Sequence, residues 1–143
     1  MRNSSTICVD ASLVMHLIAV TSGERIRGLW ERWQKEGQQL VAPVLLRYEV
    51  TNALYRYQKA GMISGDATME ALNAAFALPI QFYNDLELHK SALAMAGHFG
   101  LPAAYDAHYL ALAERLGAIF ITTDRRLVNA VQSALPWVQL AET

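Results

Sequence analysis

The sequence predicts one domain of the α/β class over residues 1–143, a three-layer α/β/α sandwich with a central parallel sheet. Short apolar segments of four or five residues alternate with longer segments whose apolar residues recur every three or four positions. Hydrophobic residues make up 53% of the chain and charged residues 17%, which is enough apolar material for a core. No linker, repeat or low-complexity segment divides the chain, so a single domain is expected.

Capping residues, glycines and prolines set the boundaries that we predict for these elements. We expect strands at residues 6–9, 39–42, 80–83, 118–122 and 137–140. We expect helices at residues 12–20, 24–37, 44–60, 86–99, 103–116 and 125–134, and another after the turn 64–66 that ends near residue 77.

In the first half of the chain, a β-branched and apolar segment runs up to Asp10, and Ser12 is suited to begin the first helix. Gly37 is suited to end the second helix, because glycine adopts the left-handed conformation of a helix C-terminus. Pro43 is expected in the first turn of the third helix, where its missing N–H is not needed.

In the second half, Pro79 ends one helix before a short strand, and Asp85 caps the next helix. Gly100 is expected to end that helix and Pro102 to begin another, which Gly117 ends. The apolar segment that follows predicts a strand leading to another short helix.

Two aspartates follow predicted strands. In a parallel sheet the reactive crevice lies outside the carboxyl ends of the strands. Asp10 and Asp124 each come after a strand and before a helix, so both are expected at that edge. Each residue alone could equally be a helix cap, since aspartate accepts hydrogen bonds from free backbone N–H groups.

Two further acids lie on predicted helices. Glu49 is at the edge of the core-facing side of the third helix, and its spacing from Arg47 and Arg56 does not suit a helical ion pair. Asp106 lies along a mostly apolar helix face. Burying an ionised aspartate without a partner costs several kcal/mol, so Asp106 needs a cation, a hydrogen-bond network or a position near the helix start.

Four acids gathered at one edge would repel one another and raise their own pKa values unless positive charge lay between them. Magnesium and manganese take oxygen ligands and leave positions for water and phosphate oxygens. The sequence therefore predicts a Mg²⁺- or Mn²⁺-dependent site for phosphodiester hydrolysis, with Asp10, Glu49, Asp106 and Asp124 as both metal-binding and catalytic residues.

The segments ICVDASLVM, RYEVTNAL, AYDAHYLALAE and IFITTDRRL occur in this order along nearly the whole chain. Together they resemble the PIN-domain family, in particular the VapC-type toxin ribonucleases of type II toxin–antitoxin systems. The resemblance implies a PIN-like fold and assigns metal binding to the same four acids. It also implies supporting polar roles for Ser12, Asn52 and Thr123.

The same resemblance implies metal-dependent endonucleolytic cleavage of RNA, with a transfer RNA as the expected target. It implies a homodimer that a cognate VapB-type antitoxin inhibits. The chain departs from an acid-rich pattern after Asp124, where Arg125 and Arg126 follow and no further acid is present. A second metal would therefore be weakly held, or absent until substrate supplies phosphate oxygens.

The sequence allows two interpretations of the roles of several residues. Arg125 and Arg126 could hold substrate phosphates or be ordinary solvated residues at a helix start. Trp30 and Trp33 share a helix face and could belong to the core or anchor a partner. Cys8 is expected to be a buried hydrophobe.

The histidines are not expected to bind metal. His108 is two residues from Asp106 and so should lie on another helix face. The other histidines, His16, His89 and His98, show no paired metal-ligand spacing.

Other function classes fit less well. A G-x-G-x-x-G motif is absent after the first strand, and Ser12 stands where a haloacid-dehalogenase phosphatase needs its second aspartate. The main alternative is a non-catalytic PIN-like module that binds RNA or protein. The formal net charge of −1 neither supports nor excludes RNA. The sequence has no membrane-spanning stretch and no leader-like start, so we expect a cytoplasmic protein without membrane contact.

Overall fold

Five short parallel strands form the central sheet of the computed structural model, which describes residues 5–18 and 23–142. The strands are β1 (Thr6–Val9), β2 (Gln39–Pro43), β3 (Ile80–Tyr83), β4 (Ile119–Thr122) and β5 (Val138–Leu140). The helices are α1 (Ala11–Leu17), α2 (Glu24–Lys35), α3 (Leu45–Lys59), α4 (Gly65–Phe76), α5 (Leu86–Phe99), α6 (Tyr105–Leu116) and α7 (Arg125–Val131). The predicted α/β class and parallel sheet are confirmed.

Strand β1 lies at the centre of the sheet, whose order is β3-β2-β1-β4-β5. Cys8 lies opposite Val41 of β2 and Phe120 of β4, and all three side chains are buried. A central parallel strand is covered by helices on both faces, so each of its positions must be apolar or hydrogen-bonded. This explains the unbroken apolar character of the strand segments and confirms Cys8 as a core residue.

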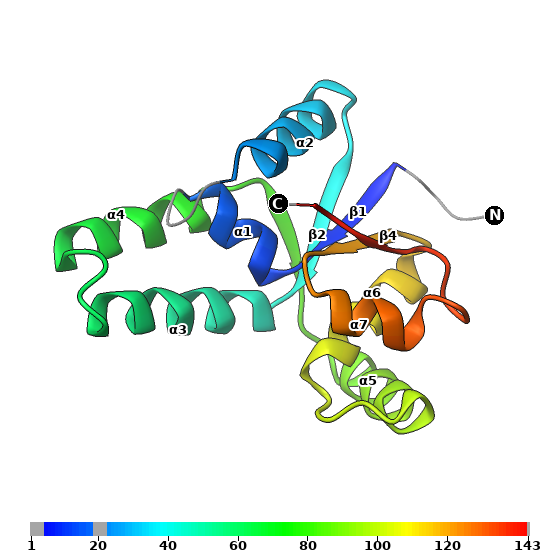
Figure 1. The fold of residues 1–143 in the computed structure, drawn as a ribbon. Coiled ribbons are helices and arrows are strands. Elements are labelled where there is room, and N and C mark those ends of the chain that lie inside the picture. Colours follow the sequence, from blue (N-terminus) through cyan, green and yellow to red (C-terminus); the bar gives the residue numbers. More distant parts are fainter. Residues whose placement is uncertain (1–4, 19–22, 143) are drawn as a thin grey trace.

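The helices form two layers around the sheet (Figure 1). The chain passes outward from β1 to β2 and β3, and then returns across β1 to β4 and β5. Because parallel crossovers are right-handed, helices α1–α4 fall on one face of the sheet and helices α5–α7 on the other. Helices α3 and α4 pack against each other and extend away from the sheet. The carboxyl ends of the strands thus open between the two layers.

Several predicted boundaries were wrong by a few residues. Helix α1 begins at Ala11 and not at Ser12, because the Asp10 side chain caps it by accepting a hydrogen bond from the Leu13 amide. The helix was predicted to extend to residue 20, but it ends at Leu17. Residues 19–22 lie outside the described part of the chain. Pro43 is the last residue of β2, not the first of a helix.

The later helices also differ at their ends. Helix α6 begins at Tyr105, two residues after the predicted start, and α7 ends at Val131, short of residue 134. The glycines that end these helices were predicted correctly. Gly37 follows the end of α2 with φ +70°, and Gly100 caps α5 with φ +62°.

The two tryptophans of α2 pack together, with ring centroids 6.2 Å apart. Trp33 is buried and Trp30 is half-buried against the core, which favours the core interpretation over an exposed anchor for a partner. Among the described residues, no helix is both long and apolar enough to cross a membrane.

Candidate active site

Asp10 stands between β1 and α1, and its carboxylate is held from two sides. Its Oδ1 accepts hydrogen bonds from Ser12 Oγ at 2.6 Å and from the Leu13 amide at 3.3 Å. Its Oδ2 accepts a hydrogen bond from Thr122 Oγ1 at 2.5 Å. Thr122 is the last residue of β4, so the neighbouring strand fixes the orientation of Asp10.

Burial raises the pKa of Asp10, and the charge of Asp106 raises it further. The hydrogen bonds from Ser12, Thr122 and Leu13 act in the opposite direction, because they favour the ionised form. Asp10 is therefore a desolvated carboxylate that lies within electrostatic reach of a second acid.

Glu49 lies on α3, one turn after the end of β2, and is half-buried. Its Oε1 accepts a hydrogen bond from the Tyr109 hydroxyl at 2.5 Å. Tyr109 is buried in α6 and stacks on Phe120 of β4, with ring centroids 5.6 Å apart. Burial raises the pKa of Glu49 despite this hydrogen bond, and the charges of Asp106 and Asp10 raise it further.

Asp106 lies in the first turn of α6 and is half-buried. Burial raises the pKa of Asp106, and the charge of Asp124 raises it further. Within the described residues, no group donates a hydrogen bond to its carboxylate. Its position in the first turn of α6 matches the helix-start location that the sequence left open, and the helix N-terminus attracts an anion weakly.

Asp124 follows β4 and caps α7. Its Oδ1 accepts hydrogen bonds from the amides of Arg126 at 3.0 Å and Leu127 at 3.2 Å. Its own amide donates to Thr122 Oγ1 at 3.0 Å, the same hydroxyl that donates to Asp10. Asp124 is thus a helix cap, and its charge also acts on Asp106.

The four acids therefore come from four separate segments and are electrostatically coupled. The charge of Asp106 acts on Asp10, and the charges of both aspartates act on Glu49. The charge of Asp124 acts in turn on Asp106. In the described part of the chain, no three Asp, Glu, His or Cys side chains are already arranged as a cluster that could hold a metal ion. The four acids are neighbours at one edge of the sheet, but their carboxylates are not arranged around a single metal position.

The chemistry of this donor set nevertheless fits a hard divalent cation. All the donors are carboxylate oxygens, and the pKa values of Asp10, Glu49 and Asp106 are raised by burial and by their mutual charge. A cation between them would relieve the repulsion, and Mg²⁺ and Mn²⁺ prefer oxygen ligands.

The supporting residues that the sequence suggested have different positions. Ser12 Oγ accepts a hydrogen bond from the Thr123 amide at 3.3 Å while it donates to Asp10, so both residues belong to the site. Asn52 is exposed and borders a hollow with Tyr48 and Tyr55, and the structure gives it no contact with the acids.

Arg125 and Arg126 begin α7 beside Asp124 and are exposed. Arg125 Nη2 lies 3.7 Å from Glu142 Oε1, in a contact exposed to solvent. Surface ion pairs of this kind are weak, so the Arg125 guanidinium can exchange its partner for a phosphate.

Sequence reasoning missed Tyr109 and Thr122 as residues of the site. Each lies close in the chain to a predicted acid, but its hydrogen bond spans 60 residues to Glu49 or 112 residues to Asp10. No local pattern predicts such contacts. The nearby contact between His89 and His108, at 2.9 Å between ring nitrogens, was missed for the same reason.

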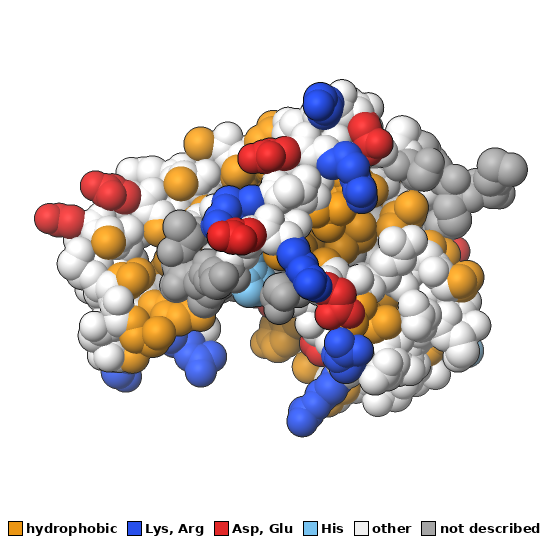
Figure 2. Space-filling model, turned by 45° about the horizontal axis from the view of Figure 1, so that its top comes forward, with side chains coloured by type: hydrophobic (Ala, Val, Ile, Leu, Met, Phe, Trp, Pro, Cys, Tyr) orange, Lys and Arg blue, Asp and Glu red, His pale blue; other side chains and the backbone are white. Residues whose placement is uncertain are grey.

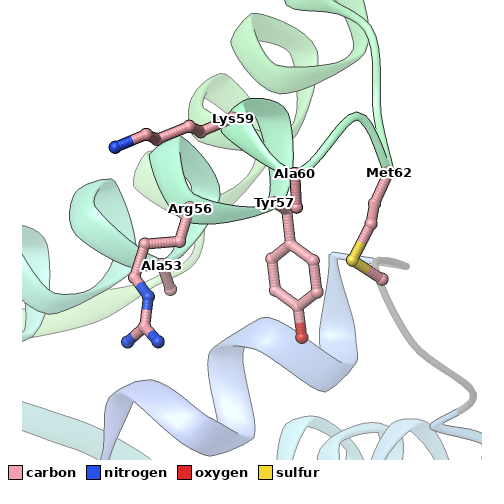
Figure 3. A pocket seen from close by; sticks show the side chains of 6 residues that line it. All are labelled: Ala53, Arg56, Tyr57, Lys59, Ala60 and Met62. Carbon is pink, nitrogen blue, oxygen red and sulfur yellow. The ribbon is translucent and has the colours of Figure 1, made fainter.

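The surface of the molecule is hollowed in more than one place. Figure 2 shows a notch in the lower outline of the molecule, between the part that carries α3 and α4 and the part that carries α5–α7, with Lys and Arg side chains on both sides. A separate pocket lies farther along α3, where Tyr57 points toward α1 and Arg56 and Lys59 lie beside it (Figure 3). None of the four acids lines this pocket, whose lining runs along α3 from Ala53, one turn after Glu49, to Lys59, about 15 Å along the helix from Glu49.

Comparison with known proteins identifies the family. Residues 7–131 match the PIN domain family. Ribonuclease VapC3 of Pyrobaculum aerophilum is 33% identical over 105 residues, which cover 69% of this chain and 76% of that protein. Ribonuclease VapC3 of Mycobacterium tuberculosis is 32% identical over 128 residues, which cover 90% of this chain and 89% of that protein.

A solved structure is similar over most of the chain. The crystal structure of PAE2754 from Pyrobaculum aerophilum superimposes with a TM-score of 0.68 at 26% sequence identity. The match covers 87% of this chain and 84% of that one. The chain therefore belongs to the PIN-domain family, and its relatives within that family are VapC-type ribonucleases.

Proposed function

We propose that this protein is a Mg²⁺- or Mn²⁺-dependent endoribonuclease, the VapC-type toxin of a toxin–antitoxin pair. The observation that carries the proposal is the gathering of Asp10, Glu49, Asp106 and Asp124 at the carboxyl edge of the sheet. Burial and mutual repulsion raise the pKa values of Asp10, Glu49 and Asp106. A protein that only binds RNA has no reason to collect repelling carboxylates, because they weaken its hold on phosphates.

The residues of the chain prepare the site before substrate arrives. Ser12 and Thr122 orient Asp10, and Tyr109 orients Glu49, so two of the four acids are held by hydroxyl donors. A divalent cation held by the four acids would polarise the scissile phosphate and lower the pKa of water. Arg125 and Arg126, beside Asp124, are placed to contact phosphates that flank the cleavage position.

The likeness to VapC ribonucleases supports a proposal for the substrate and the partners. The relatives that we describe are ribonucleases by name, which supports RNA as substrate, and a transfer RNA is the first target to test. A cognate VapB-type antitoxin would inhibit the protein in the cytoplasm, and the active form would be a homodimer. Sedimentation of the purified protein should then give about twice the mass of the 15.9 kDa chain.

The test uses antitoxin-free protein and two RNA substrates, a transfer RNA and a circular RNA. Circular RNA has no ends, so only an endonuclease can cut it. Each RNA is incubated with Mg²⁺, with Mn²⁺ or with a chelator. Asp10→Asn and Asp106→Asn remove one carboxylate each, and asparagine retains helix-capping ability at residue 10. Asp66→Asn, an exposed position in the first turn of α4, is the matched control.

The proposal expects cleavage of both RNAs by the wild type and by Asp66→Asn, only when a metal ion is present. Asp10→Asn and Asp106→Asn should be inactive although their circular dichroism spectra and melting curves remain those of folded protein. Cleavage that survives both substitutions would overturn the site. Binding of RNA without cleavage under any metal condition would instead favour a non-catalytic binding module.

A further inference from the structure

A cleft of about 380 Å³ lies beside the acids, at the carboxyl ends of β2 and β3. Pro43 and Tyr83, the last residues of these strands, form part of its lining. The remaining lining residues come from the starts of α3, α5 and α6 and the loop before α5, and they include Tyr48, Asn84, His89, Tyr105 and His108. Clefts of roughly 300–1,000 Å³ are typical of small-ligand sites.

Two lining residues of the cleft directly precede two of the acids in the chain, which places the cleft next to the candidate active site. Tyr48 precedes Glu49 on α3, and Tyr105 precedes Asp106 on α6. Each pair places one residue in the cleft and the next among the acids. A nucleotide held in the cleft would therefore lie next to a phosphate held at the acids.

The lining is rich in aromatic side chains, two of which the described residues leave largely exposed. Tyr48 and Tyr105 are 71% and 65% exposed, and Tyr83, the last residue of β3, is half-buried. No lining residue is an Asp or a Glu, in contrast to the neighbouring site. Exposed aromatic faces without carboxylates suit the faces of nucleobases, which stack on such side chains.

The two histidines of the cleft have fixed hydrogen-bonding roles when both are neutral. His108 Nδ1 lies 2.8 Å from the carbonyl oxygen of Ala104, and a carbonyl only accepts, so Nδ1 carries the proton. His108 Nε2 then accepts a hydrogen bond from His89 Nδ1, 2.9 Å away. This leaves Nε2 of His89 as an acceptor on an exposed residue. Together with the side-chain amide of Asn84, it can read the polar edge of a base.

We infer that this cleft binds one unpaired nucleobase of the RNA, next to the scissile phosphate, by stacking on Tyr105 and Tyr48 with polar contacts to His89 and Asn84. The inference rests on the proposed ribonuclease function and adds a substrate class to it. The RNA must present at least one unstacked base at the cut, as loops and single strands do.

The test measures binding of short, labelled single-stranded RNAs by fluorescence anisotropy. It uses full-length protein carrying Asp10→Asn, with Mg²⁺, so that the RNA stays intact. In a series of otherwise identical RNAs, each position in turn is made abasic. The second substitutions are Tyr105→Ala, Tyr105→Phe and Tyr48→Ala. Tyr55→Ala, another exposed tyrosine on α3 that lies outside the cleft, is the matched control.

One abasic position should weaken binding by about 5- to 150-fold, the range for losing one stacked base. Tyr105→Ala should weaken binding of the intact RNA to a similar extent and make it insensitive to that abasic position. Tyr105→Phe, which retains the aromatic ring, should bind like its parent, and so should Tyr55→Ala. Melting curves check that each variant is folded.

Two outcomes separate this inference from the proposed function. In one outcome the protein cuts RNA, but Tyr105→Ala and Tyr48→Ala change neither its affinity for RNA nor its response to abasic positions. The base site is then overturned and the ribonuclease proposal stands. The other outcome is that the wild type never cuts RNA, but Tyr105→Ala makes binding insensitive to one abasic position. The base site is then supported and the nuclease proposal is overturned.

Discussion

At the scale of single residues, the acids of this site combine structural and chemical roles. Asp10 and Asp124 are helix caps, as the sequence allowed, and they are also coupled to Asp106. The positions of these acids could be predicted because each sits beside a strand or helix boundary. Their hydroxyl partners could not, because Thr122 reaches Asp10 only after the sheet has formed.

Asp106→Asn should stabilise the metal-free protein at neutral pH. The pKa of Asp106 is raised above its ordinary value of 3.8 by burial and by Asp124, so the folded state holds that proton more tightly than the unfolded chain. Protonation of Asp106 contributes its full amount to the stability of the fold below pH 3.8. That contribution is lost as the pH rises through the raised pKa of Asp106. At pH 7 the ionised carboxylate therefore opposes folding.

Melting temperatures measured in a chelator at pH 7 and at about pH 4 check this prediction. The gain of the variant over the wild type should shrink in acid, and Asp66→Asn should show no such pattern. A variant that melts below the wild type at pH 7 would contradict this account of Asp106.

Tyr109→Phe should impair metal binding and cleavage without removing any acid. The substitution deletes the hydroxyl that donates to Glu49 but keeps the ring that stacks on Phe120. Loss of a residue that orients a ligand typically costs about 10- to 100-fold in metal affinity or activity. The Mg²⁺ concentration that gives half-maximal cleavage should rise, whereas Tyr57→Phe, on the α1 side of α3, should leave it unchanged.

At the scale of elements, helix α6 contributes most to the site. It carries Asp106, His108 and Tyr109 within its first turn and a half. Its start was predicted two residues too early because Pro102 suits a helix N-terminus in isolation. In the fold, Pro102 and Ala103 belong to the connection after Gly100, and Ala104 at the start of α6 makes no side-chain cap. A boundary difference of one or two residues is common at helix ends.

The capping serine of α4 offers a test of an element away from the acids. Ser64 Oγ accepts a hydrogen bond from the Ala67 amide at 3.1 Å, and both residues are outside the site. Ser64→Ala should lower the free energy of unfolding by about 1 kcal/mol, the usual cost of a lost N-cap. Urea unfolding measures the change, with Ser91→Ala in the middle of α5 as the control. RNA cleavage by Ser64→Ala should match that of the wild type, and a loss of activity would show that α4 affects the site.

At the scale of the whole molecule, the class of fold was predictable and the arrangement of the acids was only partly so. Apolar segments of strand length separated by helices indicated a parallel sheet, which the structure confirms. The order of strands does not follow from periodicity, and it is this order that places Thr122 beside Asp10 and Tyr109 beside Glu49. The positions of Asn52 and of the His89–His108 contact also needed the folded structure.

Metal ions should stabilise the whole domain if the four acids bind them. An ion that binds only the folded state adds RT ln(1 + [M]/Kd) to the free energy of unfolding, about 2.7 kcal/mol at 100 times Kd. Differential scanning calorimetry should therefore show a rise in melting temperature with Mg²⁺ or Mn²⁺ for the wild type. Asp10→Asn and Asp106→Asn should lose most of this rise, and an equal rise in all three proteins would place the ion elsewhere.

The central position of β1 makes assembly of the candidate site depend on β4, a strand made much later in synthesis. β1 emerges first from the ribosome, but one of its neighbours is β4, which ends at Thr122, and Asp124 follows. A nascent chain that stops before β4 has neither the hydroxyl that orients Asp10 nor the fourth acid. A chain synthesised only as far as β3 would therefore lack the complete candidate site, which can assemble only after β4 and Asp124 have been made.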